Sequence, residues 1–194
     1  MKSIFTDCYL NNSWKSTESR SGPGSHISRT ENIRRRLLNI ISTYNVTSVR
    51  DCPCGDLNWI SPIIDKIPNY LGIDIVDDLI RDNKRKYPHL DFEIDDITTS
   101  NLLKCDLLVV RDALFHFSQE NVKKAIMNIK RNNPKYLLTT EVEDVSHINK
   151  DIRTGTWYPI ALRNPPYNFP EPILKIKEDS TNKFISLWRV EDIP

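Results

Sequence analysis

Apolar and polar positions alternate in blocks along most of the chain. Short apolar runs that suit buried strands cover Thr47–Cys52, Tyr70–Ile75, Asp91–Ile94, Asp106–Arg111 and Tyr136–Thr140. Segments with helical character lie between them, near Asn58–Asp65, Asp78–Tyr87 and Gln119–Lys130. Strands that alternate with helices are typical of repeated β-α units. The pattern therefore predicts an α/β fold, a mostly parallel sheet with helices on both faces.

The segment before the first strand predicts a further helix of about four turns. It begins at Ser28, because Ser28 to Glu31 has the Ser-x-x-Glu form of a capping box, and apolar residues then recur at helical spacing as far as Tyr44. In a similar way, Ser118 is placed to cap the helix near Gln119–Lys130. The helix near Asn58–Asp65 has weaker support, since Pro62 must lie in its first turn or break it.

Two segments lack a regular period. Residues 1–27 contain two of the five glycines and predict an irregular arm over the active site, while 28–194 form a single domain. Prolines recur from Pro159 to Pro172, so 141–172 is expected to be a loop. A loop of this kind can act as a lid over the substrate that accepts a transferred group. The runs Ile173–Lys177 and Lys183–Val190 then predict a closing hairpin.

Composition limits the classes of function. The chain has 194 residues, which suits one domain, and its formal net charge is only +1. No overall positive field attracts nucleic acid or a membrane surface, and no apolar stretch is long enough to span a bilayer. Without a signal sequence, a cytoplasmic protein is expected. Cys52 and Cys54 lack further ligands at zinc spacing, so they predict buried, reduced thiols.

The turn after the first predicted strand carries the clearest sign of a ligand. Asp51 ends this strand and Gly55 follows in the turn, where nucleotide cofactors bind in doubly wound sheets. Asp74 comes twenty-three residues after Asp51, at the end of the second strand. An acidic residue at this spacing is placed to accept hydrogen bonds from ribose hydroxyls.

The same turn favours one kind of cofactor. A dinucleotide site normally has three glycines facing a pyrophosphate, whereas Gly55 stands alone and is followed by Asp56, which would repel that group. S-adenosylmethionine carries adenosine and a positive centre but no phosphate. Asp51 and Asp56 would attract such a cofactor.

An ordered set of motifs resembles the class I S-adenosylmethionine-dependent methyltransferases, and more narrowly a short group associated with sugar and polysaccharide modification. The matching segments are Ser21–Ser25 with Thr30 and Ile33-Arg34, Asp51–Asp56 with Trp59, Gly72–Ile75, Arg111–His116, Asn149 to Trp157, Pro165-Pro166, Phe169-Pro170 and Ser186–Arg189. They extend from about residue 20 to the end of the chain.

The resemblance implies a Rossmann-like, seven-stranded sheet with an antiparallel last strand, and S-adenosylmethionine as the cofactor, with S-adenosylhomocysteine as product. The residues it implies around the cofactor are Asp51, Cys54, Gly55, Asp74, Ile75, Asp95, Asp96, Ile97 and Arg111. Arg34 is a further candidate, for the cofactor carboxylate or a substrate phosphate. Asp95-Asp96 also resembles a metal-binding pair, but its position assigns it to adenine, so no metal site is predicted.

The chain departs from the family pattern at two positions. Arg50 lies where such strands usually carry an apolar residue, so its side chain must leave the core or meet a carboxylate. Arg111-Asp112 replaces the Asn-Pro-Pro-Tyr type of motif, which disfavours nucleic acid bases and glutamine as methyl acceptors.

His116 is the candidate general base, since it follows the fourth strand, where active sites of open α/β sheets form. Asp112 lies four residues earlier and would orient the imidazole if this segment were helical. The alternative is that His116 packs structurally among its apolar neighbours and that Asp112 acts as a cap or pairs with a nearby Arg. Candidate substrate-binding residues are Trp14, Asn149, Arg153 and Trp157.

The sequence thus predicts O-methylation of a sugar hydroxyl, on a nucleotide-linked or glycan-bound hexose or amino-deoxyhexose. The choice of a sugar as the methyl acceptor rests on the family resemblance and not on composition. The alternatives are a methyltransferase acting on RNA or a small metabolite, or an inactive scaffold that binds the cofactor. No membrane or nucleic-acid partner is expected, and the oligomeric state stays open.

Overall fold

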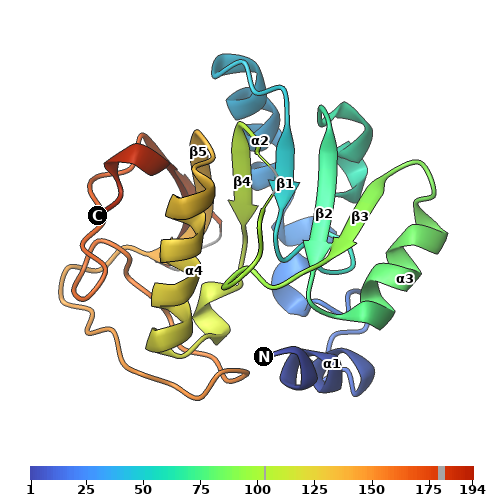
Figure 1. The fold of residues 1–194 in the computed structure, drawn as a ribbon, viewed down its shortest axis with the longest axis horizontal. Helices are drawn as coiled ribbons and strands as arrows, with labels where there is room; N and C mark the ends of the chain where they lie inside the picture. Colours follow the sequence, from blue (N-terminus) through green and yellow to red (C-terminus); the bar gives the residue numbers. More distant parts are fainter. Residues whose placement is uncertain (103, 179–181) are drawn as a thin grey trace.

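The computed structural model describes residues 1–102, 104–178 and 182–194. Within them, seven strands form one sheet in the order β3-β2-β1-β4-β5-β7-β6 (Figure 1). The strands are β1 (Val49–Asp51), β2 (Tyr70–Asp74), β3 (Asp91–Ile94), β4 (Leu107–Val110), β5 (Tyr136–Val142), β6 (Leu174–Lys177) and β7 (Lys183–Arg189). The first five pair in parallel, and β7 runs antiparallel to β5 and β6. The predicted sheet and closing hairpin are confirmed.

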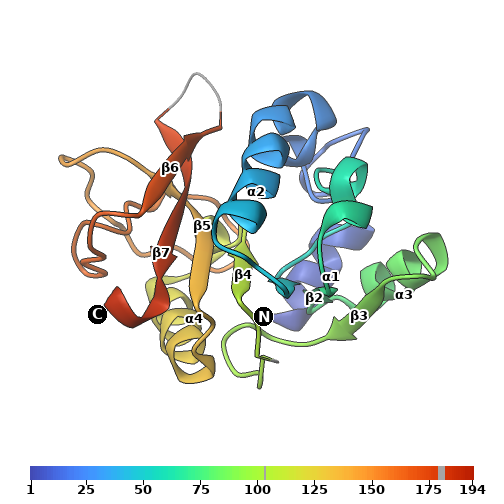
Figure 2. The same ribbon diagram turned by 90° about the horizontal axis from the view of Figure 1, so that it is seen from above.

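Helices cover both faces of this sheet. They include α2 (Glu31–Thr43), α3 (Asp77–Lys86) and α4 (Gln119–Asn132). Along β4, Leu107 and Val109 pack in the core layer shared with α2 and α3, whereas Leu108 and Val110 pack in the layer shared with α4. Successive side chains of a strand point to opposite faces, so a strand buried on both faces is apolar throughout. Figure 2 shows α2 and α4 on opposite sides of the sheet.

The predicted cap of α4 is confirmed, but that of α2 is wrong. The Ser118 hydroxyl accepts a hydrogen bond from Asn121 N at 3.3 Å. By contrast, α2 begins at Glu31 and Ser28 lies in a preceding 3₁₀ turn. Thr30 occupies the cap position, yet its hydroxyl donates to the His26 carbonyl at 2.9 Å and makes no capping bond.

The N-terminal segment is more regular than predicted. Residues Lys2–Leu10 form a helix, α1, instead of part of an irregular arm. Two contacts fasten this helix to α3: Lys2 Nζ lies 2.7 Å from a carboxylate oxygen of Asp77, and the Tyr9 hydroxyl donates to Asp82 at 2.6 Å. Figure 1 shows α1 below the sheet, on the side toward which the arrows of β1, β2 and β4 point.

Two other predictions need correction. The segment expected to be a helix over Asn58–Asp65 forms a 3₁₀ helix over Ser61–Lys66, with Pro62 in its first turn. Arg50 does not leave the core, and it meets no carboxylate among the described residues. It is buried, and its Nη1 donates to the carbonyl oxygens of Asn69 at 2.8 Å and Val49 at 3.1 Å. Among the described residues, no helix is long and apolar enough to cross a membrane.

Candidate functional site

A cavity of about 140 Å³ lies where β1 to β4 end. Its wall combines the turn Cys52–Gly55, the segments Asp74–Val76 and Asp95–Ile97 after β2 and β3, and several residues of Arg111–Phe117 after β4. Side chains of α1 and of the segment that follows it complete the wall. In open α/β sheets, ligands bind outside the carboxyl ends of the strands. The cavity is therefore the candidate active site.

Gly55 holds the turn after β1 in a conformation that suits glycine. Its φ is +58°, and its backbone N–H donates to the Asp74 carboxylate at 3.1 Å. A Cβ at this position would lie 2.2 Å from the Ser21 hydroxyl oxygen. The missing side chain thus admits Ser21 of the N-terminal segment into the cavity wall.

Asp56 anchors the same segment and does not line the cavity. Its carboxylate accepts hydrogen bonds from the Ser19 hydroxyl at 2.9 Å, the Arg20 backbone N–H at 2.7 Å and the Ser21 hydroxyl at 3.1 Å. The expectation that Asp56 faces a cofactor is therefore wrong, because the N-terminal segment uses this carboxylate.

Two buried carboxylates lie at this end of the sheet. Burial raises the pKa of Asp74 to about 6, although the backbone N–H groups of Val76 and Gly55 favour its ionised form. Burial also raises the pKa of Asp51 to about 7, against the hydrogen bond from the Tyr70 hydroxyl at 3.0 Å. Asp51 Oδ1 is buried and has no hydrogen-bond partner among the described residues. An unpaired buried carboxylate oxygen is suited to a cationic ligand group.

Asp95, Asp96 and Ile97 form the wall beside β3. The backbone N–H of Asp95 donates to the Asp74 carbonyl at 3.0 Å, which holds this segment next to the end of β2. The Asp96 carboxylate is used locally, because Oδ1 accepts from the backbone N–H of Thr98 at 2.9 Å. In the part of the chain that the structure describes, no group of three metal-binding side chains gathers.

His116 also lines the cavity and contacts Trp14, with the two rings tilted by 45° and their centroids 4.3 Å apart. Its Nδ1 is 2.8 Å from the Thr156 carbonyl oxygen. Because a carbonyl only accepts, Nδ1 carries the proton of the neutral ring and Nε2 keeps a free lone pair. Burial lowers the pKa of His116, against that hydrogen bond and the nearby charge of Asp112. A neutral imidazole with a free Nε2 is the form that a general base requires.

Asp112 also lines the cavity but does not orient His116. Its φ is +54°, so the chain does not continue helically from Asp112 to His116, and no hydrogen bond joins the two side chains. Instead, the Asp112 carboxylate lies 2.7 Å from Lys183 Nζ and 3.4 Å from Arg111 Nη1. The predicted orienting role of Asp112 is therefore wrong, and the Thr156 carbonyl fills it.

Comparison with solved structures finds similar folds at low sequence identity. Magnesium protoporphyrin IX methyltransferase from Synechocystis PCC 6803, with bound S-adenosylmethionine, is 13% identical with a TM-score of 0.64, over 96% of this chain and 94% of that one. A S-adenosylmethionine-dependent methyltransferase from Clostridium acetobutylicum is 12% identical with a TM-score of 0.59, over 84% and 91%. The chain has the class I methyltransferase fold.

Human N-acetylserotonin methyltransferase, in complex with S-adenosylmethionine, is 13% identical with a TM-score of 0.58. The match covers 80% of this chain but only 50% of that enzyme, so this chain spans about half of its length. No family profile and no curated protein is significantly similar in sequence. The comparisons thus support the class I methyltransferase fold, and they do not reach the narrower sugar-modification group.

Most of the residues predicted around a cofactor come together in this fold. The cavity wall includes Cys54, Gly55, Asp74, Ile75, Asp95, Asp96, Ile97 and Arg111. Asp51 is buried at the end of β1, behind the wall, and Cys54 is a buried free thiol, as predicted. Arg34 does not reach the cavity, because its guanidinium donates to the Trp59 carbonyl at 3.1 Å and the Ile27 carbonyl at 3.0 Å.

Of the four predicted substrate-binding residues, only Trp14 lines the cavity. Asn149 fastens the 141–172 loop to itself, since its amide donates to the Ala161 and Pro165 carbonyls at 2.9 and 2.8 Å. Arg153 is exposed, and Trp157 is 60% exposed with its ring edge-on to Phe115. The loop meets the site through its backbone, at the Thr156 carbonyl.

The N-terminal arm was predicted over the active site, but the helix α1 within it, which supplies part of the cavity wall, was not predicted. Phe5, Cys8 and Tyr9 line the cavity, and the Phe5 ring lies 5.9 Å from that of Phe117. Ile4, Phe5, Cys8 and Tyr9 repeat at i, i+1, i+4 and i+5, which is a helical stripe. This short stripe was the available signal for α1.

Proposed function

We propose that this chain is an S-adenosylmethionine-dependent methyltransferase that binds its cofactor in the cavity at the ends of β1 to β4. The observation that carries the proposal is the unpaired, buried Oδ1 of Asp51 beside a wall that presents Asp74. The ribose hydroxyls of such a cofactor can donate to Asp74, and its cationic groups are attracted by the charge of Asp51 behind the wall, whereas both carboxylates would repel a pyrophosphate.

Each part of the wall has a role toward this cofactor. Asp74 would accept hydrogen bonds from the ribose, and Asp51 would stabilise the positively charged methionine part. The wall at Asp95, Asp96 and Ile97 would hold adenine. When bound, the cofactor supplies a methyl group on sulfonium, which is a good leaving group. Much of the acceleration then comes from holding the acceptor in line with that methyl group.

The residues around His116 favour an acceptor that loses a proton. His116 Nε2 is free within the described chain and takes the proton from a hydroxyl as the new bond to carbon forms. The Thr156 carbonyl holds Nδ1–H and keeps the ring in this orientation. The arrangement therefore supports O-methylation.

We further propose that the hydroxyl belongs to a sugar, on a nucleotide-linked or glycan-bound hexose or amino-deoxyhexose. The motif resemblance supports this choice. The adjacent Trp14 and His116 rings, together with Phe117, also give the cavity an aromatic face, which suits a sugar ring. A small metabolite, RNA or an inactive scaffold are the outcomes of the test that would replace this proposal.

Calorimetric titration with S-adenosylhomocysteine tests the cofactor. We expect micromolar binding to the wild type and no binding of NADH. Asp74→Ala should weaken S-adenosylhomocysteine binding about tenfold or more, or about 1.4 kcal/mol, because the ribose hydroxyls lose their acceptor.

Asp91→Ala is the matched control, since Asp91 is an exposed aspartate on β3 outside the cavity. It should bind like the wild type. No binding by folded wild-type protein would exclude the methyltransferase proposal. If S-adenosylhomocysteine binds, a screen of nucleotide sugars, glycans, small metabolites and RNA for transfer of labelled methyl identifies the acceptor. Binding without transfer to any class would favour the scaffold.

The affinity for S-adenosylhomocysteine should rise with pH. The pKa values of Asp51 and Asp74 are about 7 and about 6, so both are partly protonated in mildly acidic solution. S-adenosylhomocysteine has no sulfonium, but its ammonium group is positively charged and favours the ionised carboxylates, so binding releases protons. Between about pH 5.5 and pH 8 we expect about a tenfold gain in affinity. Titrations in buffers of different ionisation enthalpy measure the released protons, and Asp51→Asn should flatten the profile. Affinity that falls with pH would contradict the assignment.

A further inference from the structure

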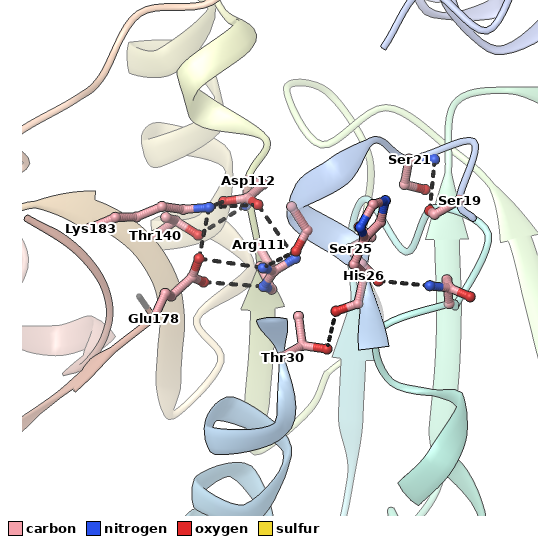
Figure 3. A network of polar contacts seen from close by, with 12 residues as sticks. Ser19, Ser21, Ser25, His26, Thr30, Arg111, Asp112, Thr140, Glu178 and Lys183 are labelled. Carbon is pink, nitrogen blue, oxygen red and sulfur yellow. Dashed lines mark hydrogen bonds and ion pairs between the residues drawn. The ribbon is translucent and has the colours of Figure 1, made fainter. Parts of the chain in front are cut away.

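A cluster of four charged side chains extends from the cavity wall, at Arg111 and Asp112, to Glu178 and Lys183, which do not line the cavity (Figure 3). It joins Arg111 and Asp112 after β4 to Glu178 after β6 and Lys183 at the start of β7. Lys183 Nζ lies 2.7 Å from a carboxylate oxygen of Asp112 and 2.7 Å from one of Glu178. Arg111 Nε lies 3.2 Å from the same Glu178 carboxylate. Lys183 is therefore a bridge between two carboxylates.

The cluster is poorly solvated and fixed from several sides. The side chains of Arg111 and Glu178 are 3% and 5% exposed. Arg111 also donates to the Gly24 carbonyl at 2.7 Å, which ties the N-terminal segment to the cluster. Charges shielded from water act more strongly on one another and on nearby groups than charges at the surface.

Asp112 is the member of the cluster that faces both Lys183 and the cavity. Its φ of +54° is unusual for a residue with a side chain, and its backbone N–H donates to the Thr140 hydroxyl at 2.9 Å. Such strained conformations persist when the surroundings fix them, and they gather at functional sites. The conformation places the Asp112 carboxylate on the wall that carries His116.

Resting on the proposed function, we propose that Lys183 is a positioning residue for the reaction. Its bridge to Asp112 and Glu178 fixes the place and the field of the Asp112 carboxylate on the wall of the base, His116. The four side chains carry two positive and two negative charges. Removing Lys183 leaves a net negative charge on the other three side chains.

Within the described residues, Asp112 favours the protonated ring of His116 and Lys183 opposes it. The Thr156 carbonyl also favours the protonated ring through its hydrogen bond. Lys183→Met should therefore raise the pKa of His116 by about one unit. Glu178→Gln should lower this pKa, because the cluster then becomes more positive. Lys183→Arg, which keeps the charge, should stay close to the wild type.

The experiment is an NMR titration of the His116 ring, assigned with His116→Asn. Lys177→Met is the matched control, since Lys177 is an exposed lysine on the neighbouring strand β6, and it should leave the titration unchanged. Opposite shifts in Lys183→Met and Glu178→Gln support the proposal. Unchanged titration in folded Lys183→Met, or shifts of one sign in both variants, would overturn it. If Lys183→Met does not fold, the pKa of His116 in Glu178→Gln still decides. A lower pKa supports the proposal, and an unchanged or higher pKa overturns it.

Binding of S-adenosylhomocysteine to the same variants separates this inference from the proposed function. Lys183→Met should retain most of the affinity, because Lys183 does not line the cavity. Loss of binding in the wild type would remove the proposed function, whatever the His116 titration shows. Normal binding with an unmoved titration would instead remove only the role of Lys183.

Discussion

His116→Asn lowers the rate of methyl transfer by about 10²- to 10⁴-fold, the usual contribution of a positioned general base. The asparagine amide keeps a donor near Nδ1 and can still bond to the Thr156 carbonyl, which is 2.8 Å from Nδ1 in the structure. The variant therefore removes the proton acceptor, Nε2, while the local hydrogen bond remains. The measurement is the rate of labelled methyl transfer from S-adenosylmethionine to the acceptor found in the screen.

The affinity for S-adenosylhomocysteine should change little in this variant, since Asp51 and Asp74 remain in place. His89→Gln is the control: His89 lies away from the cavity, 3.2 Å from Asp65. It should react at the wild-type rate. A loss smaller than about threefold in His116→Asn would mean that the acceptor needs no base, or that its proton leaves through another group.

The cofactor half of the site was largely predictable from sequence. Strands β1 and β2 end in Asp51 and Asp74, and parallel strands bring such residues to one edge of a sheet without any knowledge of loop structure. Gly55 is predictable in the same way, because it stands in the turn that follows β1. These residues depend on local pattern and on the direction of the strands, both of which are encoded over short stretches.

The acceptor half depends on contacts between distant segments, and there the predictions were less accurate. Asp112 and His116 are four residues apart, but the positive φ of Asp112 ends the helical relation that the spacing assumed. The Thr156 carbonyl, and not Asp112, orients the His116 ring. It is a backbone group forty residues after His116, and it carries no sequence signal.

Loop side chains were hardest to place. Asn149, Arg153 and Trp157 have the residue types of a sugar site, yet a proline-rich loop can turn either face toward the sheet. In the structure, hydrogen bonds inside the loop decide this, and Asn149 makes two of them. Helix α1 shows the same limit, because its contacts with Asp77 and Asp82 of α3 join residues more than seventy positions apart.

Gly55→Ala should lower the free energy of unfolding by about 2–5 kcal/mol. The positive φ of Gly55, +58°, costs an alanine about 1–2 kcal/mol. The new methyl group would also lie 2.2 Å from the Ser21 hydroxyl oxygen and 3.1 Å from Ser21 Cβ, and overpacking of this kind costs about 1–3 kcal/mol. Ser21 must then leave Asp56, to which it is bonded at 3.1 Å. Denaturant unfolding measures the loss, and S-adenosylhomocysteine affinity should fall with it.

A double-mutant cycle with Ser21→Gly separates the two costs. Ser21→Gly removes both atoms that the new methyl group would meet, so the double variant should lose less stability than the sum of the two single variants. The loss of stability that Gly55→Ala still causes in the Ser21→Gly background is the backbone cost of alanine at a positive φ. Additive losses would show that Ser21 does not pack against Gly55 in solution. The coupling therefore measures whether the N-terminal segment belongs to the wall of the cavity or only lies near it.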